Sequence, residues 1–89
     1  MLLAVDVGNS NISLGIFQNS ILRMKAKISV KTRRSADEYA AVLYDLMRMN
    51  HIAREEIKGC ILASVVPELT GLVEDAARIV TGTQVLRVG

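Results

Sequence analysis

The stretch "LLAVDVGNSNISLGIF", Leu2 to Phe17, decides the fold of this 89-residue chain. Its first part, Leu2 to Val7, consists of Leu, Ala and Val around one aspartate, which predicts a short strand covered on both faces. From Ile12 to Phe17 apolar residues occupy alternate positions, as in a strand with one buried face. The small and polar residues Gly8 to Asn11 join the two, so the chain is predicted to open with a hairpin.

A third strand with two different faces is predicted after a turn at Gln18 to Ser20. One face is apolar and the other is strongly basic. The apolar set is Met24, Ala26, Ile28 and Val30, and the polar set is Arg23, Lys25, Lys27, Ser29 and Lys31. A row of lysines discourages pairing with another chain, so this segment is predicted to lie at the edge of a sheet.

The periodicity then changes to that of a helix. Ser35 followed three residues later by Glu38 is a capping box, which predicts a helix that begins at Ala36. Apolar residues at helical spacing continue from there, and the pattern ends near Asn50.

A strand, a helix and a strand complete the predicted order. Gly59 to Val66 is nearly continuous apolar sequence, typical of a central strand, and Pro67 suits the first position of a helix that Gly82 ends. Thr83 to Val88 predicts the last strand. The order β-β-β-α-β-α-β predicts an α/β fold, a mixed sheet with helices packed on it. It is the order of the ribonuclease-H-like unit, one half of the actin-like kinase and ATPase fold, and residues 1–89 are expected to form one such domain, incomplete by itself.

The composition argues against a nucleic-acid partner, a disulfide and a membrane span. The net charge of +2 is too small to imply a nucleic-acid partner, and with only three aromatic residues no stacking platform for bases is expected. Cys60 is the single cysteine, so no disulfide can form within the chain. Proteins of the reducing cytosol typically lack disulfides as well. No apolar run approaches the ~20 residues of a membrane span. We expect a cytoplasmic protein without a membrane or nucleic-acid partner.

The loop after the first strand has the chemistry of a phosphate site. Gly8 leaves room for a ligand beside the backbone, and Asn9, Ser10 and Asn11 carry short side chains that donate hydrogen bonds. Asp6, just before the loop, would repel phosphate directly but can hold Mg²⁺ that bridges to phosphate oxygens. Gly-Asn-Ser-Asn is also ordinary hairpin chemistry, so a plain turn stays open as an interpretation.

Three motifs in register resemble the N-terminal part of the type III pantothenate kinases, members of the actin-like kinase superfamily. "DVGNSN" from Asp6 resembles that family's "DxGNT/SN" phosphate motif, with Ser10 in place of the commoner threonine. "TRRSADEY" from Thr32 is similar to "TRRTADEY", and "ASVVPEL" from Ala63 to "SSVVPxL". The closing "VLRVG" resembles the strand before the family's pantothenate-binding region.

The resemblance implies ATP-dependent phosphorylation of pantothenate to 4'-phosphopantothenate, the first step of coenzyme A biosynthesis. It further implies Mg²⁺ at Asp6, a monovalent cation (K⁺ or NH₄⁺) and a homodimer when the protein is full length. The family's catalytic aspartate lies in a "GADR" segment that these 89 residues do not contain, so the chain is expected to be inactive alone. The implied ATP-binding residues are Asp6, Val7, Gly8, Asn9, Ser10, Asn11, Ile12 and Ser13.

Two other functions stay open on the sequence. One is a non-catalytic regulatory or interaction domain of the same fold. The other is a ribonuclease-H-like nuclease, which needs several converging carboxylates for two metals. The predicted strand Gly59 to Val66 supplies no aspartate at its end, which counts against the nuclease. Ser64 itself, Arg33 and Arg34 are secondary candidates for a site, whereas Cys60 is expected to be inert packing and His51 to lie just past a helix end.

Overall fold

The computed structural model describes all of residues 1–89. Its elements follow the predicted order, with one short 3₁₀ helix added between the first helix and the fourth strand. They are β1 (Leu2–Val7), β2 (Asn11–Gln18), β3 (Ile21–Ser29), α1 (Ala36–Met49), η1 (Arg54–Glu56), β4 (Gly59–Ser64), α2 (Pro67–Thr81) and β5 (Val85–Arg87).

The five strands form one mixed sheet in the order β3-β2-β1-β4-β5. β1 pairs with β2 and β2 with β3 in antiparallel fashion, whereas β4 is parallel to both β1 and β5. β3 is therefore an edge strand, as its lysines predict, and β4 lies inside the sheet. β4 stops at Ser64 and β5 spans only Val85–Arg87, so both are shorter than the sequence pattern suggests.

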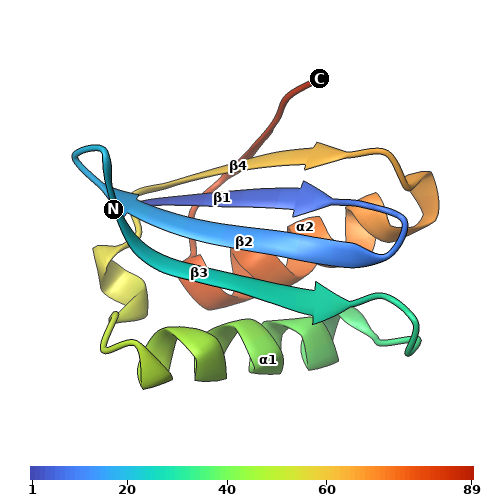
Figure 1. The fold of residues 1–89 in the computed structure, drawn as a ribbon, viewed down its shortest axis with the longest axis horizontal. Helices are drawn as coiled ribbons and strands as arrows, with labels where there is room; N and C mark the ends of the chain where they lie inside the picture. The colour runs from blue at the N-terminus through green and yellow to red at the C-terminus, as the bar shows by residue number, and fades with distance from the viewer.

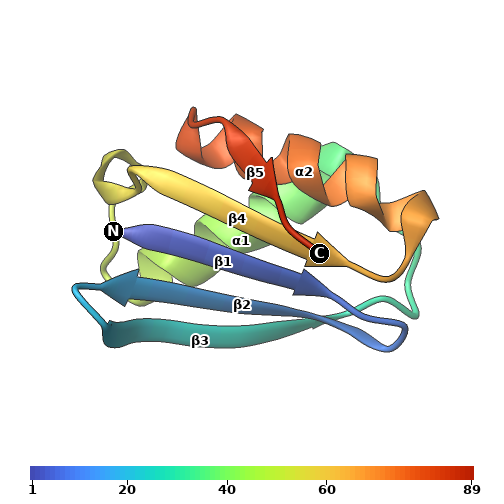
Figure 2. The same ribbon diagram turned by 90° about the horizontal axis from the view of Figure 1, so that it is seen from above.

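Both helices cover the same face of the sheet. Figure 1 shows the sheet edge-on, with α1 and α2 in one layer beneath it, and Figure 2 looks onto the uncovered face. Every buried residue is apolar, and the core lies between the sheet and the helices. In β1, Leu3, Val5 and Val7 point into this core, while Leu2 and Asp6 are exposed. The prediction that β1 is covered on both faces is wrong for this chain, because a second covering layer is absent.

The capping box at the start of α1 is confirmed. The Ser35 hydroxyl accepts a hydrogen bond from the Glu38 amide at 3.2 Å, and the Glu38 carboxylate accepts one from the Ser35 amide at 2.8 Å. The hydrogen bonds from Ser35 hold the pKa of the Glu38 carboxyl below its ordinary value. Two donors at the helix start, which no helical carbonyl can satisfy, are thereby paired.

α2 has the predicted ends and holds the last strand in place. Pro67 occupies the first turn, and Gly82 ends the helix with a φ of 69°, a conformation that favours glycine. Arg87 of β5 donates to the carboxylate of Glu74 on α2, with Nε and Oε2 2.6 Å apart. Arg78 also contacts Glu74, at 3.1 Å. These contacts hold β5, which has only three residues, against α2.

Candidate functional site

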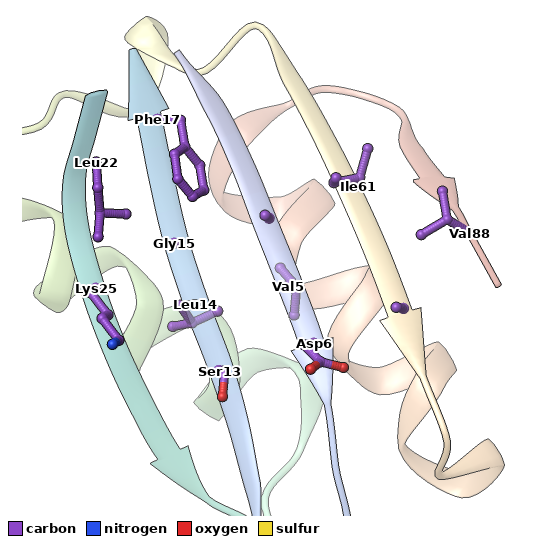
Figure 3. A pocket seen from close by; sticks show the side chains of 12 residues that line it. Val5, Asp6, Ser13, Leu14, Gly15, Phe17, Leu22, Lys25, Ile61 and Val88 are labelled. Atoms are coloured by element: carbon purple, nitrogen blue, oxygen red, sulfur yellow. The ribbon is translucent and has the colours of Figure 1, made fainter. Parts of the chain in front are cut away.

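Asp6 and Ser13 meet on the uncovered face of the sheet. The two residues are direct partners in the β1–β2 register, so their side chains share one face at the end of the hairpin. Their neighbours Val5 and Val7 point into the core instead. Figure 3 shows the Asp6 carboxylate and the Ser13 hydroxyl next to each other, on the two adjacent strands. Neither side chain takes part in a hydrogen bond or an ion pair, so both are available to a ligand.

The loop between these strands is held by backbone hydrogen bonds on three sides. The Gly8 amide donates to the Asn11 carbonyl at 2.9 Å, and the Val30 amide, after β3, donates to the Ser10 carbonyl at 3.1 Å. The Val65 amide, after β4, donates to the carbonyl of Val7 at 3.1 Å. Segments from three parts of the chain therefore fix the position of this loop.

Glycine at position 8 is favoured by a close approach and not by an unusual torsion. None of the four loop residues has a positive φ, which sets this loop apart from the tight hairpin turns that depend on one. A Cβ atom at Gly8 would lie 3.2 Å from the Asn11 carbonyl oxygen, closer than ordinary contact. The plain-turn interpretation, which rests on tolerance of positive φ, therefore does not explain this glycine.

The loop leaves hydrogen-bond donors free. The backbone amides of Asn9 and Ser10 donate to no group of the protein. The side chains of Asn9, Ser10 and Asn11 are likewise without hydrogen-bond partners within the chain. Free amides beside small polar side chains are the donor set that binds phosphate oxygens.

The eight residues of the implied ATP-binding segment divide into two groups. Six of them are at least partly accessible: Asp6, Gly8, Asn9, Ser10, Asn11 and Ser13. Val7 and Ile12 are 0% and 1% exposed, so their side chains belong to the core under the sheet. Any contact that these two make with a ligand has to come from their backbone.

The residues present fit a hydrated magnesium ion better than a metal held by protein alone. No group of three or more His, Cys, Asp or Glu side chains comes together anywhere in the chain. Mg²⁺ commonly keeps several waters and binds one or two carboxylates together with substrate phosphates. The single unpaired carboxylate of Asp6, with the Ser13 hydroxyl beside it, matches that pattern.

A hollow that the sequence did not reveal lies beside this site on the uncovered face. We call it the trough. Its volume is about 400 Å³, and small residues of three adjacent strands, Ala4, Gly15 and Ala63, form its floor. Larger apolar residues flank it, and Figure 3 shows how they surround it: Phe17, Leu22, Ile61 and Val88. Asp6 and Ser13 lie at one end, and Lys25 lines the β3 side. The small residues Ala4 and Gly15, direct partners in the β1–β2 register, are the sequence signal for it.

The secondary candidates are engaged within the protein. The Ser64 hydroxyl accepts a hydrogen bond from Thr70 at 2.8 Å and from the Val66 amide at 3.1 Å, so it joins the end of β4 to α2. Arg34 donates to the Ser29 carbonyl at 2.7 Å and lies 5.8 Å from the centre of the Tyr39 ring. Both residues therefore have structural roles here.

Arg33, Cys60 and His51 lie apart from Asp6. Arg33 lines a hollow of about 390 Å³ that it shares with Asn9 of the loop, on the side of the helices. Cys60 is 3% exposed, and burial raises the pKa of its thiol to about 11, which confirms that it is inert packing. His51 follows the end of α1, as predicted, with a φ of 59°.

Comparison with known proteins shows the family of this chain. A family model described as type III pantothenate kinase matches residues 2–89. The type III pantothenate kinase of Geotalea uraniireducens is 43% identical over the whole chain, and that of Moorella thermoacetica is 40% identical. The chain spans about a third of these relatives, 35% of the length of each.

A solved structure shares the fold. The ROK hexokinase from Thermus thermophilus superposes on 98% of this chain and 34% of its own, with a TM-score of 0.63 and 15% identity. At that identity the likeness concerns the fold alone, and it confirms the actin-like α/β architecture. No helix of the chain is long and apolar enough to span a membrane.

Proposed function

Because the chain belongs to the type III pantothenate kinase family, we propose that it supplies the ATP phosphate-binding loop of an enzyme that phosphorylates pantothenate. The proposed reaction transfers the terminal phosphoryl group of ATP to pantothenate and gives 4'-phosphopantothenate, the first step of coenzyme A biosynthesis. The chain spans about a third of its curated relatives, so turnover is assigned to the larger protein and not to these 89 residues.

The observation that carries this proposal is the set of unpaired polar groups at one end of β1 and β2. A loop that only reverses the chain has no need for an unpaired carboxylate beside free amides. Here Asp6, the Asn9 and Ser10 amides and the Ser13 hydroxyl all lack partners within the protein. The backbone bonds that fix the loop keep these groups in place before a ligand arrives, which lowers the entropic cost of binding.

Each residue of the segment has a role in the proposal. The Asn9 and Ser10 amides and the side chains of Asn9, Ser10 and Asn11 bind phosphate oxygens, and Gly8 keeps the loop tight. Asp6 holds Mg²⁺, with Ser13 beside it. When bound, the metal neutralises charge on the phosphate groups. Val7 and Ile12 anchor the loop in the core.

Further properties of the family are proposed for the larger protein. They are a monovalent cation, K⁺ or NH₄⁺, a homodimeric assembly and a cytoplasmic location. No residue of this chain is assigned to the monovalent cation or to the dimer interface.

The test is the activity of a protein that joins this chain to the part of the Geotalea uraniireducens relative that it does not match. We expect formation of 4'-phosphopantothenate from ATP and pantothenate, and an Asp6→Asn variant slower by about a hundredfold or more. Asp45→Asn, an exposed carboxylate on α1, is the matched control and should keep full activity. Equal rates for Asp6→Asn and the unchanged protein would contradict the role of Asp6.

The two other functions make different predictions in this assay. A regulatory domain of the same fold would bind nucleotide or a partner without forming product. A nuclease would need more carboxylates at the site than Asp6, and these 89 residues bring no others there. No specific observation in the structure favours either function.

A further inference from the structure

We propose that a basic hollow beside the β1–β2 loop binds the phosphate group of a phosphorylated small molecule. The basic hollow has a volume of about 390 Å³, and the polar residues that line it are Asn9, Lys31, Arg33, Tyr39 and Glu68. This site would be present in addition to the proposed ATP site. The proposal does not require the loop to bind ATP or Asp6 to bind a metal.

The basic hollow lies on the side of the sheet away from Asp6. Tyr39 of α1 and Leu69 of α2 line it, and both helices cover the face opposite to the one on which Asp6 lies. Figure 1 shows the β1–β2 loop, the segment after β3 and the start of α2 together at one end of the molecule. The Val30 amide donates to the Ser10 carbonyl at 3.1 Å, which fixes the segment after β3 against the loop. The hollow is therefore formed by parts of the chain that are held together.

Two positive charges in the basic hollow are not neutralised by the protein. The side chains of Lys31 and Arg33 form no ion pair and no hydrogen bond within the chain. Glu68 is the only carboxylate that lines the hollow, and it forms no ion pair with either of them. A phosphate monoester carries about 1.5–2 negative charges at pH 7, which matches two cations better than a carboxylate does. Arginine can in addition donate two parallel hydrogen bonds to phosphate oxygens.

A buried tyrosine supplies an unpaired donor to the same hollow. Tyr39 is 3% exposed, and its hydroxyl forms no hydrogen bond within the chain. No side-chain oxygen or nitrogen is both fully buried and unpaired, so this hydroxyl is accessible and opens into the hollow that Tyr39 lines. Tyrosine hydroxyls of buried rings usually have a hydrogen-bond partner. An oxyanion between this hydroxyl and the two cations would be that partner.

The remaining wall of the basic hollow is apolar, which indicates an organic ligand. Val30, Val66 and Leu69 form this wall. The volume of the hollow falls within the range of about 300–1,000 Å³ that is typical of sites for small organic molecules. At the start of α2, Val66 has no side chain that can cap the helix, and the helix end further favours a negative charge there. We therefore assign the ligand as a phosphate monoester with a small apolar body.

Titration of the ¹⁵N-labelled chain with phenyl phosphate, without nucleotide or Mg²⁺, tests the proposal. Phenyl phosphate carries both features of the proposed ligand, whereas inorganic phosphate and benzyl alcohol each carry one. We expect the amides of Lys31, Arg33 and Glu68 to shift, with a Kd in roughly the millimolar range. Inorganic phosphate should bind more weakly by about threefold or more, and benzyl alcohol should leave these amides in place. Equally tight binding of inorganic phosphate would overturn the assignment of an organic ligand.

Substitutions locate the binding. Arg33→Gln and Tyr39→Phe should each weaken binding of phenyl phosphate by about fivefold or more, because each removes a hydrogen bond to a charged group. Phenylalanine keeps the aromatic ring at position 39 in the core, so the fold is retained. The matched controls are Lys58→Gln, at the opposite end of β4, and Tyr44→Phe, an exposed tyrosine of α1. Both should stay within about twofold of the unchanged protein.

Glu68→Gln should act in the opposite direction. Removal of its negative charge from the basic hollow should strengthen binding by about twofold or more, which a loss of stability would not do. Unchanged affinity in Arg33→Gln and Tyr39→Phe would overturn the proposal. If the probe then shifts only the Asn9 and Ser10 amides, it binds at the loop, and the proposed ATP site stands without a second site.

Discussion

Asp6 and Ser13 lie directly opposite each other on β1 and β2, and neither side chain has a partner within the protein. The neighbouring strand positions that point to the helices are apolar and buried, whereas Asp6 and Ser13 lie on the uncovered face of the sheet. Unpaired polar groups held in a fixed position are what a binding site requires before its ligand arrives.

Replacing Asp6 by asparagine should weaken binding of ATP analogues in Mg²⁺ by about tenfold or more, because a neutral amide is a poorer ligand for Mg²⁺. Binding without Mg²⁺ should change little. Isothermal titration calorimetry of both proteins, with and without the metal, measures this difference. Asp6 is exposed and unpaired, so the free energy of unfolding should be unchanged, and a large loss of stability would point to a structural role.

Replacing Gly8 by alanine should destabilise the protein by about 1 kcal/mol, because the new Cβ would lie 3.2 Å from the Asn11 carbonyl oxygen. Gly71→Ala is the matched control. Nothing lies within 4 Å of a Cβ at Gly71, and the residue is inside α2, so alanine should stabilise by about 0.5–1 kcal/mol. Urea denaturation measures the free energy of unfolding of both variants. If both are destabilised, or both are stabilised, the close approach at Gly8 does not determine the effect of the substitution.

Replacing Ser35 by alanine should cost about 1 kcal/mol of stability, because the hydroxyl caps α1 by accepting from the Glu38 amide. The bond from the Ser35 backbone amide to the Glu38 carboxylate, the main cause of the lowered Glu38 pKa, does not depend on the Ser35 side chain. Ser35→Asp should restore most of the stability, since aspartate caps helices as well as serine does. Thermal unfolding of the three proteins decides between a cap and a neutral surface position.

Glu74 should make stability depend on pH. Hydrogen bonding from Arg87 holds the pKa of the Glu74 carboxyl below its ordinary value of 4.5. A carboxyl whose folded pKa is lowered contributes stability above the ordinary pKa, and that contribution is lost as the pH falls through the folded pKa. We therefore expect Glu74→Gln to be less stable than the unchanged protein at pH 7. The difference in the free energy of unfolding should become smaller below about pH 4.5.

The control for this pH effect is Glu55→Gln, which removes an exposed carboxylate 3.9 Å from Arg54. An exposed pair at that distance contributes little. Urea denaturation at several pH values should show a lower free energy of unfolding for Glu74→Gln than for the unchanged protein. Glu55→Gln should show no such difference. A gap for Glu74→Gln that stays constant down to pH 3 would contradict the ion pair with Arg87 as its cause.

Local signals made most of the fold predictable. The capping box at Ser35 and the glycine at position 82 fixed the helix ends because each acts through bonds or torsions of neighbouring residues. The alternation in β2 predicted which side is buried for the same reason. What covers the other side of β1 could not be predicted, because Leu, Ala and Val suit a strand in either setting and the covering layer is remote in sequence.

The candidate site was predictable in its residues and not in its geometry. The loop composition indicated phosphate chemistry, yet the pairing of Asp6 with Ser13 depends on the hairpin register, which loop length alone did not specify. The composition predicts that Gly8 leaves room for a ligand, and it does not reveal the close approach of the Asn11 carbonyl to this position. The trough depends on three strands that come together only in the folded sheet.

The most direct measurement of the central claim is a titration of the ¹⁵N-labelled chain with a non-hydrolysable ATP analogue, followed by amide NMR shifts. The account predicts that the Asn9 and Ser10 amides shift most, that Mg²⁺ strengthens the effect, and that Asp6→Asn removes the strengthening. Amides of α1 and β3 outside the loop contacts should stay in place. Unchanged Asn9 and Ser10 resonances at millimolar analogue and Mg²⁺ would contradict a phosphate-binding loop in this chain.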